Sequence, residues 1–252
     1  MDLPLSFYTV TMFAILLTGI SKSGFGGGLG VMAVPMMSLF VAPQFAAAVL
    51  MPILLVMDIL IISRYRKDWN PLVLRALVPG AFAGLTIGMA TFQWMDANMI
   101  RFAVGLLAVI FVVQFLLRNR RPNSKAQSGF LTSSVLSAIS GFASFVAHAG
   151  GPPIKGYLLS QNLGKTAFVG TNTAFFFMLN AIKAVIYGAL GTLSQESLTV
   201  SLMVAPVLFL GVVIGTTLHH YIDQKRFVQI VYVFLSFTAV RLLYDSVPTL
   251  LG

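Results

Sequence analysis

Apolar runs cover most of the chain, and short polar segments separate them. Two long apolar blocks, at 5–41 and 129–160, are each interrupted by a cluster of glycines. The six uninterrupted runs have close to the 20 or so residues that a helix needs to cross a bilayer: 44–63, 71–92, 98–117, about 165–187, 197–219 and 226–243. The pattern predicts an all-α polytopic membrane protein.

The glycine clusters lie at 24–35 (GFGGGLGVMAVP) and, less densely, at 146–157 (VAHAGGPPIKGY). Glycine costs about 1 kcal/mol relative to alanine in a helix interior, and three adjacent glycines serve no single helix face. Each cluster is therefore expected to unwind the chain at membrane depth. In the first block, Leu5 to Ser23 can span the bilayer, whereas Gly30 to Val41 is too short to do so comfortably.

The second half of the sequence repeats features of the first. Pro79, Gly84 and Gly88 return with the same spacing as Pro206, Gly211 and Gly215, and the pair Arg101-Phe102 returns as Arg226-Phe227. A single long period of this kind predicts two duplicated halves. We place the first repeat at 1–117, a basic linker at 118–128 and the second repeat at 129–252. The four-residue spacing of Gly80, Gly84 and Gly88 also fits close helix packing.

The charges predict how the two halves are oriented. The net charge is +9, and the basic residues stand in short runs beside apolar spans, as at 64–67 and 118–121, which suits membrane orientation better than nucleic-acid binding. We predict that 64–70, 118–128 and 219–226 are cytoplasmic and that 93–97 and 188–197 lie outside. Each interrupted block must then enter and leave on one side, as a re-entrant element or a hairpin, and the two halves are inverted repeats, each with three further transmembrane helices.

Several chemistries are excluded or disfavoured by the composition. The chain has no cysteine, no paired acidic residues and no HExxH motif, so an intramembrane enzyme is disfavoured and no metal or cofactor is expected. The glycine runs match neither GxGxxG nor a phosphate-binding loop, so ATP cannot drive transport through this chain alone. No basic residue precedes Lys22, and we expect the first apolar stretch to belong to the mature fold.

An interrupted helix in each inverted half is the arrangement in which secondary transporters bind substrate. The break frees backbone N–H groups, which together with the helix dipole favour an anion, and glycines let a ligand approach the backbone. The freed amides are expected at about Gly27 to Val31 and at Gly150 and Gly151. Prolines have no N–H but begin a helix well. The predicted substrate-binding backbone comprises Gly26, Gly27, Gly28, Gly150, Gly151 and Pro152.

Charged and polar side chains lie near both breaks. Lys22 and Lys155 are predicted to neutralise a bound anion, although either lysine could instead snorkel to an interface. Ser21 and Ser23 are candidate hydroxyl donors that could also bond to their own helix backbone. His148, beside the second break, could bind substrate, relay a proton or make a structural hydrogen bond. His219 and His220 fit interfacial exposure better than metal ligation.

Further polar residues occur inside the apolar runs, where they are costly and often functional. Asp58 corresponds by repeat position to about Asn180, which suggests a role with a coupling ion, H+ or Na+; pairing with the nearby basic linker is the alternative. Asn172, Asn180 and Lys183 follow the second break and are expected to support the site.

The glycine-rich stretch ending in Val34-Pro35, repeated half a chain later as Gly150-Gly151-Pro152-Pro153, resembles the sulfite exporter TauE/SafE family over the whole chain. His148-Ala149 before the second glycine pair departs from the family's usual run of glycines. The resemblance implies export of sulfite or a small organosulfonate, such as sulfoacetate, across the bacterial inner membrane.

The leading hypothesis is a secondary transporter for a small sulfur-containing anion, working by alternating access. An anion channel of the same architecture is the nearest alternative, and a non-transport membrane scaffold is a third. The expected partners are the anion, the lipid bilayer and a coupling ion, without nucleic acid; the sequence does not determine the oligomeric state.

Overall fold

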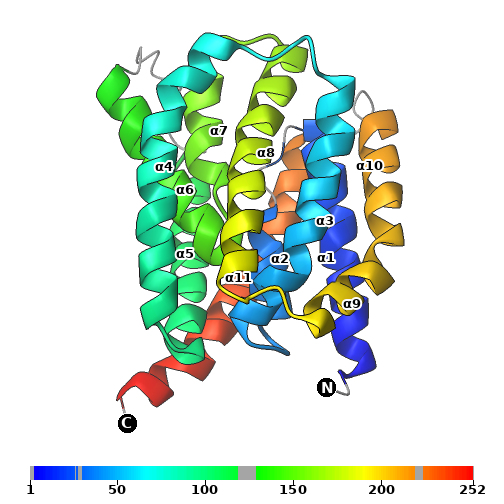
Figure 1. Cartoon of the computed structure of the whole chain (residues 1–252), viewed down its shortest axis with the longest axis vertical. Helices are drawn as coiled ribbons and strands as arrows, with labels where there is room; N and C mark the ends of the chain where they lie inside the picture. Colours follow the sequence, from blue (N-terminus) through cyan, green and yellow to red (C-terminus); the bar gives the residue numbers. More distant parts are fainter. Residues whose placement is uncertain (1–2, 26, 28–29, 119–128, 219–223, 252) are drawn as a thin grey trace.

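The fold consists of α-helices joined by short loops, and we describe it from a computed structural model of residues 3–25, 27, 30–118, 129–218 and 224–251. The long helices run roughly side by side along one axis (Figure 1). The first half contains α1 (Leu5–Phe25), the 3-10 turn η1 (Gly30–Met32), α2 (Ala33–Met37), α3 (Pro43–Arg64), α4 (Pro71–Trp94) and α5 (Ala97–Arg118). The second half contains α6 (Phe130–Ala147), α7 (Gly151–Ser160), α8 (Lys165–Ala189), α9 (Gln195–Val204), α10 (Pro206–Leu218) and α11 (Gln224–Leu251).

Several helices begin where the sequence supplies a cap. The Asn70 side chain accepts hydrogen bonds from the backbone N–H groups of Leu72 and Val73, and Pro71 occupies the first turn of α4. Ser194 caps α9 in the same way through the N–H of Ser197. Such caps satisfy N–H groups that have no partner within the helix.

Six of the described helices are long and apolar enough to cross a membrane, and a seventh span results if α9 and α10 count as one. The chain is thus an all-α polytopic membrane protein, as predicted. The apolar run at 197–219 differs from expectation, because α9 and α10 meet at an angle of 46°. Pro206 begins α10, and a proline within a helix removes a backbone hydrogen bond and clashes with the preceding turn, which accounts for a bend here.

Loops lie at two opposite ends of the bundle (Figure 1). The loop between α3 and α4 and the loop between α7 and α8 lie at one end. The loops that follow α2, α4 and α8 lie at the other end, together with both termini. The pair α1 and α2 therefore begins and ends at one end of the bundle, and the pair α6 and α7 begins and ends at the other.

Glycines allow the tightest helix contacts. A Cβ at Gly80 would clash with the carbonyl of Ser134, and one at Gly84 with the carbonyl of Ala138, so α4 and α6 touch along their backbones. Gly211 and Gly215 pack α10 against α1 in the same manner. The close-packing explanation for this glycine spacing is confirmed, and it applies in both halves.

Candidate functional site

The first break follows α1, and a hydrogen bond between backbone groups satisfies the end of that helix. Gly27 has φ +72°, a left-handed conformation that glycine adopts without a steric penalty. Its N–H donates to the carbonyl oxygen of Ser21 at 2.9 Å. A bond across six residues of this kind satisfies a free carbonyl at a helix C-terminus.

The second break has the same hydrogen bond between residues six positions apart, but here the left-handed residue comes directly before the donor. His148 ends α6 with φ +50°, and the N–H of Ala149 donates to the carbonyl of Ala143 at 3.1 Å. Left-handed backbone is uncommon outside glycine, and histidine is one of the few other residue types that adopt it more often than average. The helix resumes at Gly151, with prolines in its first turn.

One prediction about the first break was wrong. The N–H of Gly27 is bound to Ser21 and is not available to an anion. The expected half-helix from Gly30 to Val41 is reduced to η1 and the five residues of α2, because a turn interrupts it at Ser38. A helix this short contributes little dipole, so side chains must supply most of the positive charge.

The two breaks lie next to each other, although 128 residues separate their contacting atoms in sequence. The Lys155 ammonium, on α7, donates to the carbonyl oxygen of Gly27 at 3.3 Å. Lys155 therefore links the two breaks, rather than pointing away to an interface.

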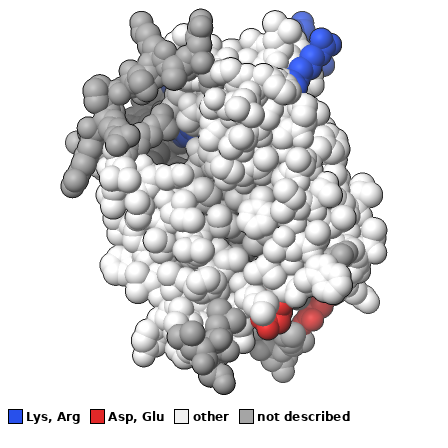
Figure 2. Space-filling model, turned by 90° about the vertical axis from the view of Figure 1, so that its left-hand side faces the viewer, with Lys and Arg blue, Asp and Glu red and all other residues white. Residues whose placement is uncertain are grey.

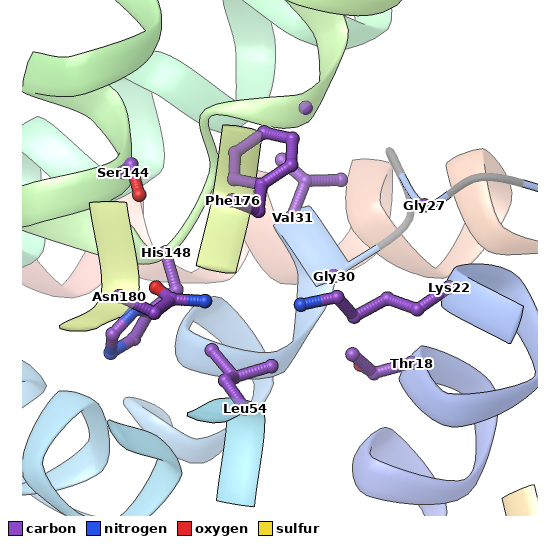
Figure 3. Close-up of a pocket in the computed structure, with 11 residues that line it drawn as sticks. Thr18, Lys22, Gly27, Gly30, Val31, Leu54, Ser144, His148, Phe176 and Asn180 are labelled. Atoms are coloured by element: carbon purple, nitrogen blue, oxygen red, sulfur yellow. The ribbon is translucent and has the colours of Figure 1, made fainter. Parts of the chain in front are cut away.

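A small pocket lies between the breaks (Figure 3). Its volume of about 30 Å³ is enough for a water-sized group. Both breaks contribute to it, and so do helices α1, α3, α6 and α8. The lining residues are Thr18, Lys22, Gly27, Gly30, Val31, Leu54, Ser144, His148, Gly151, Phe176 and Asn180.

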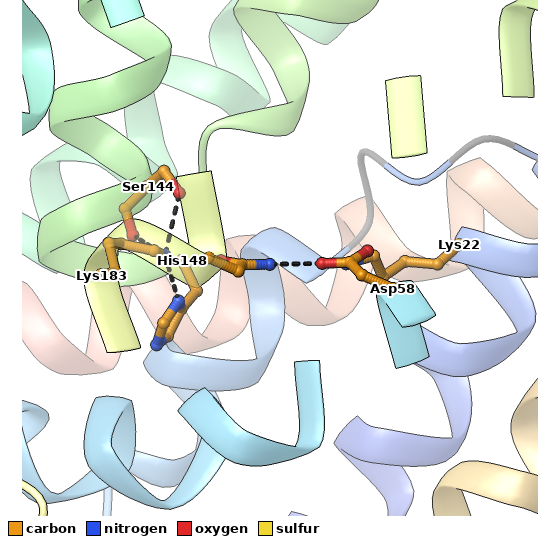
Figure 4. A network of polar contacts seen from close by, with 6 residues as sticks. Lys22, Asp58, Ser144, His148 and Lys183 are labelled. Atoms are coloured by element: carbon orange, nitrogen blue, oxygen red, sulfur yellow. Dashed lines mark hydrogen bonds and ion pairs between the residues drawn. The ribbon is translucent and has the colours of Figure 1, made fainter. Parts of the chain in front are cut away.

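A buried ion pair stands at the pocket. The Lys22 ammonium, on α1, lies 2.6 Å from Oδ1 of Asp58 on α3, and the Nδ2 amide of Asn180 on α8 donates to Oδ2 of Asp58 at 2.6 Å. In Figure 3 the Lys22 ammonium and the Asn180 amide point towards each other, and Figure 4 shows Asp58 beside Lys22. Asp58 is completely buried, and the Lys22 side chain is 9% exposed.

A second buried lysine, Lys183, lies behind His148. The Lys183 ammonium is bonded to the Ser144 carbonyl oxygen at 2.8 Å, to Ser144 Oγ at 3.0 Å and to His148 Nδ1 at 2.7 Å. The opposite ring nitrogen of His148, Nε2, lies 3.0 Å from the carbonyl oxygen of Ala47 on α3. These contacts fix the histidine ring at the wall of the pocket, with Lys183 behind it (Figure 4).

Two aromatic side chains, Tyr187 and Phe145, pack next to the Lys183–Ser144–His148 cluster and make it more rigid. Tyr187 is fully buried, its hydroxyl donates to the Phe145 carbonyl at 2.7 Å, and its ring contacts that of Phe145 edge-on. Both residues lie one turn from a member of the Lys183–Ser144–His148 cluster. Packing of this kind holds the polar groups in one arrangement.

Other predicted site residues lie beside the pocket. Ser23 Oγ donates to the carbonyls of Gly19 and Val212, so it joins α1 to α10. Gly150 packs against Ser140, whose hydroxyl donates to the Gly150 carbonyl. Ser21 is buried next to Lys22, Asn172 lies beside Gly27, and Pro152 lies in the first turn of α7. Gly26 and Gly28 lie outside the described residues.

The sequence did not identify Thr18, Leu54, Ser144 or Phe176 as lining residues. Ser144 carried one usable signal, because it lies one helical turn before His148 and would share its face. Leu54 and Phe176 are apolar residues within apolar helices, and nothing in the sequence distinguishes them from core.

Comparison with known proteins agrees with this architecture. The family model described as Sulfite exporter TauE/SafE matches residues 11–242, a stretch that contains both breaks and the whole pocket. The chain belongs to the sulfite exporter TauE/SafE family. No curated protein and no solved structure matches it.

The TauE/SafE family is a family of membrane transporters that export sulfite and related sulfur anions. In this TauE/SafE chain, cationic side chains are buried at membrane depth, where ionisable residues are costly and mark ion pathways.

Proposed function

We propose that this protein exports sulfite or a small organosulfonate, such as sulfoacetate, by alternating access. The anion binds between the two breaks, against Lys22, Gly27, His148 and Gly151. The observation that carries the proposal is a pocket lined by residues of both breaks, with the buried Lys22 side chain at its edge.

The charge of the site favours an anion. Two lysines, Lys22 and Lys183, and one carboxyl group, that of Asp58, are buried at the site, so the basic groups outnumber the acidic one. A buried net charge is expensive in a low-dielectric environment. An incoming anion lowers that cost, whereas a cation would raise it.

Helix packing supports the assignment of residues 1–117 and 129–252 as inverted halves. α1 packs on α10 and α6 packs on α4, so the first helix of each half contacts the third span of the other. α3 packs on α8 and α5 on α11, which are corresponding helices of the two halves. Exchanging the halves leaves this set of contacts unchanged, as a two-fold relationship would.

Surface charge supports an orientation in the bacterial inner membrane. On the face drawn in Figure 2, Lys and Arg side chains lie at the uppermost end and Asp and Glu at the opposite end. Arg101, near the start of α5, and Arg241, on α11, do not follow this division. The α3–α4 loop supplies Arg66 and Lys67 to the basic end, whereas Asp96 and Glu196 begin or precede helices at the other. By the positive-inside rule the basic end is cytoplasmic, and so is the linker 118–128.

Sulfite efflux from liposomes tests the proposal. Lys22→Gln keeps much of the side chain but removes the charge, and it should weaken sulfite binding roughly tenfold or more, because a hydrogen bond to a charged group contributes about 1.5–3 kcal/mol. Lys67→Gln, on the exposed α3–α4 loop, is the matched control and should transport normally. Equal sulfite efflux by both variants would remove Lys22 from the site.

The same liposomes separate a transporter from a channel. A transporter should show saturable efflux and should exchange labelled sulfite for unlabelled sulfite across the membrane. Efflux that rises linearly with sulfite concentration and shows no exchange would identify a channel.

A further inference from the structure

The lysine that lines the pocket already has a counter-ion. Asp58 lies 2.6 Å from the Lys22 ammonium, and its second oxygen accepts a hydrogen bond from Asn180. An anion that binds Lys22 must therefore compete with a carboxylate that the protein itself supplies.

If an anion displaced Asp58 from Lys22, the buried Asp58 carboxylate would have no cationic partner. Its side chain is completely buried, and breaking a buried ion pair by removing one partner is strongly destabilising. The Asn180 amide supplies one hydrogen bond and no charge. Uptake of a proton on Oδ1 removes the unpaired charge, while Oδ2 continues to accept from Asn180.

Lys183 does not replace Lys22 as the partner of Asp58, because its donors are already used. An ammonium group has three N–H donors, and Lys183 has three acceptors within 3.0 Å: the Ser144 carbonyl, the Ser144 hydroxyl and His148 Nδ1. Donation by His148 Nε2–H to the Ala47 carbonyl leaves Nδ1 as the acceptor.

The titratable groups facing Asp58 are therefore few. Lys22 approaches from α1, Lys183 from α8, and His148 lies at the end of α6. Of the other elements packed against α3, α2 and α10 carry no titratable residue in their described ranges. α9 carries only Glu196, in its first turn, and α5 only arginines, at 101 and 118.

We propose that Asp58 is an exchangeable counter-ion that couples anion transport to a proton. The anion takes the place of Asp58 on Lys22, and Asp58 accepts a proton from water on the side to which the site is open. When the anion leaves, Asp58 releases the proton on that side and pairs with Lys22 again. This inference rests on the proposed function and names its coupling ion.

Proton uptake by the purified protein tests the inference directly. Sulfite is added in weakly buffered solution with an indicator dye, at an alkaline pH at which free sulfite carries no proton. Wild-type protein should take up close to one proton for each sulfite bound. Asp58→Asn should bind sulfite more tightly and take up none, and Asp68→Asn, an exposed loop variant, should behave as wild type.

The pH dependence of wild-type affinity gives a second measurement that needs no variant. If one proton binds with the anion, the sulfite Kd should rise about tenfold for each pH unit once Asp58 is unprotonated in the free protein. Sulfite binding without proton uptake, and with a flat pH profile, would overturn the coupling role and leave the anion site standing. Absence of sulfite binding to wild type would overturn the site and the coupling together.

Discussion

Single side chains, more than backbone amides, make the pocket cationic. Lys22 reaches it from α1, and Lys183 acts through His148 from behind the wall. The Gly27 amide, which could have faced an anion, instead closes the end of α1. The amide after α1 thus satisfies a carbonyl of that helix, and lysine side chains supply the positive charge of the site.

Gly27 offers a sharp test at the scale of one residue. Gly27→Ala should lower the free energy of unfolding by about 1–2 kcal/mol, because an L-residue is strained at φ +72°. It should also weaken sulfite binding, since the added Cβ would lie 3.2 Å from Asn172 Nδ2, at the edge of the pocket. Thermal unfolding and sulfite titration measure the two effects.

Gly191→Ala is the matched control for this substitution. Gly191 has φ +67° but open space around the position of a Cβ, and it lies in the loop after α8. It should lose similar stability and keep wild-type sulfite affinity. Unchanged binding by Gly27→Ala would mean that the geometry of the first break does not shape the site.

The sequence predicted which residues to examine but not which of them meet. Lys22, Asp58, His148 and Asn180 all carry polar groups into apolar runs, and that cost is visible in the sequence. The contacts between Lys22 and Asp58, and between Asp58 and Asn180, depend on helix crossings that a one-dimensional pattern does not contain. Ser23 was predicted to donate to the anion, but in the structure its hydroxyl bonds to a carbonyl of α10 and joins that helix to α1.

At the scale of the elements, glycines have two different functions. Those in the first break permit a left-handed turn, whereas those of α4 and α10 let neighbouring helices approach along their backbones. Without a hydrophobic driving force between helices in lipid, such close contacts supply much of the association energy.

Gly84→Ala tests the second function. The added Cβ would clash with the Ala138 carbonyl on α6, and overpacking a tight contact costs about 1–3 kcal/mol or more. We expect a lower melting temperature in detergent and a smaller monodisperse fraction.

Gly188→Ala provides the comparison within another helix. Nothing lies within 4 Å of a Cβ at Gly188 on α8, so this variant should be neutral or more stable by up to about 1 kcal/mol. If both alanine variants melt like wild type, the α4–α6 contact is looser than described.

Element boundaries were predicted well where local chemistry sets them and poorly where tertiary packing does. The apolar run predicted at 71–92 corresponds to α4, which begins at Pro71, directly after its cap Asn70. The bend between α9 and α10 was not predicted, although Pro206 stands at it, because Pro79 occupies the corresponding place in α4 without ending that helix. Proline allows a bend, and the neighbouring helices decide whether one forms.

For the whole molecule, the buried polar contact between Asp58 and Asn180 can be related to the predicted repeat. Asp58 and Asn180 are separated by 122 residues, close to the repeat offset, and they bond to each other where α3 crosses α8. If the two halves are related by a two-fold axis, as proposed above, a residue and its counterpart can meet in this way only near that axis. The proposed proton site thus lies where a relative movement of the halves would alter its surroundings most.

Cysteine labelling can test the inverted arrangement in whole cells, because the natural chain contains no cysteine. Single variants Asp68→Cys, on the α3–α4 loop, and Gly164→Cys, on the α7–α8 loop, should react with a membrane-impermeant maleimide only from the cytoplasmic side. Leu39→Cys and Asp96→Cys, at the opposite end of the bundle, should react from outside. This labelling pattern is expected because the pair α1 and α2 and the pair α6 and α7 each return to the side from which they enter.

The paired comparison of Gly164→Cys with Asp68→Cys decides the topology of the second half. Both positions are exposed, so differences in reactivity reflect sidedness and not burial. If Gly164→Cys reacted from outside while Asp68→Cys reacted from inside, the α6/α7 element would cross the membrane once. The second half would then lie parallel to the first, and two breaks entering from opposite sides could not form one alternately accessible site.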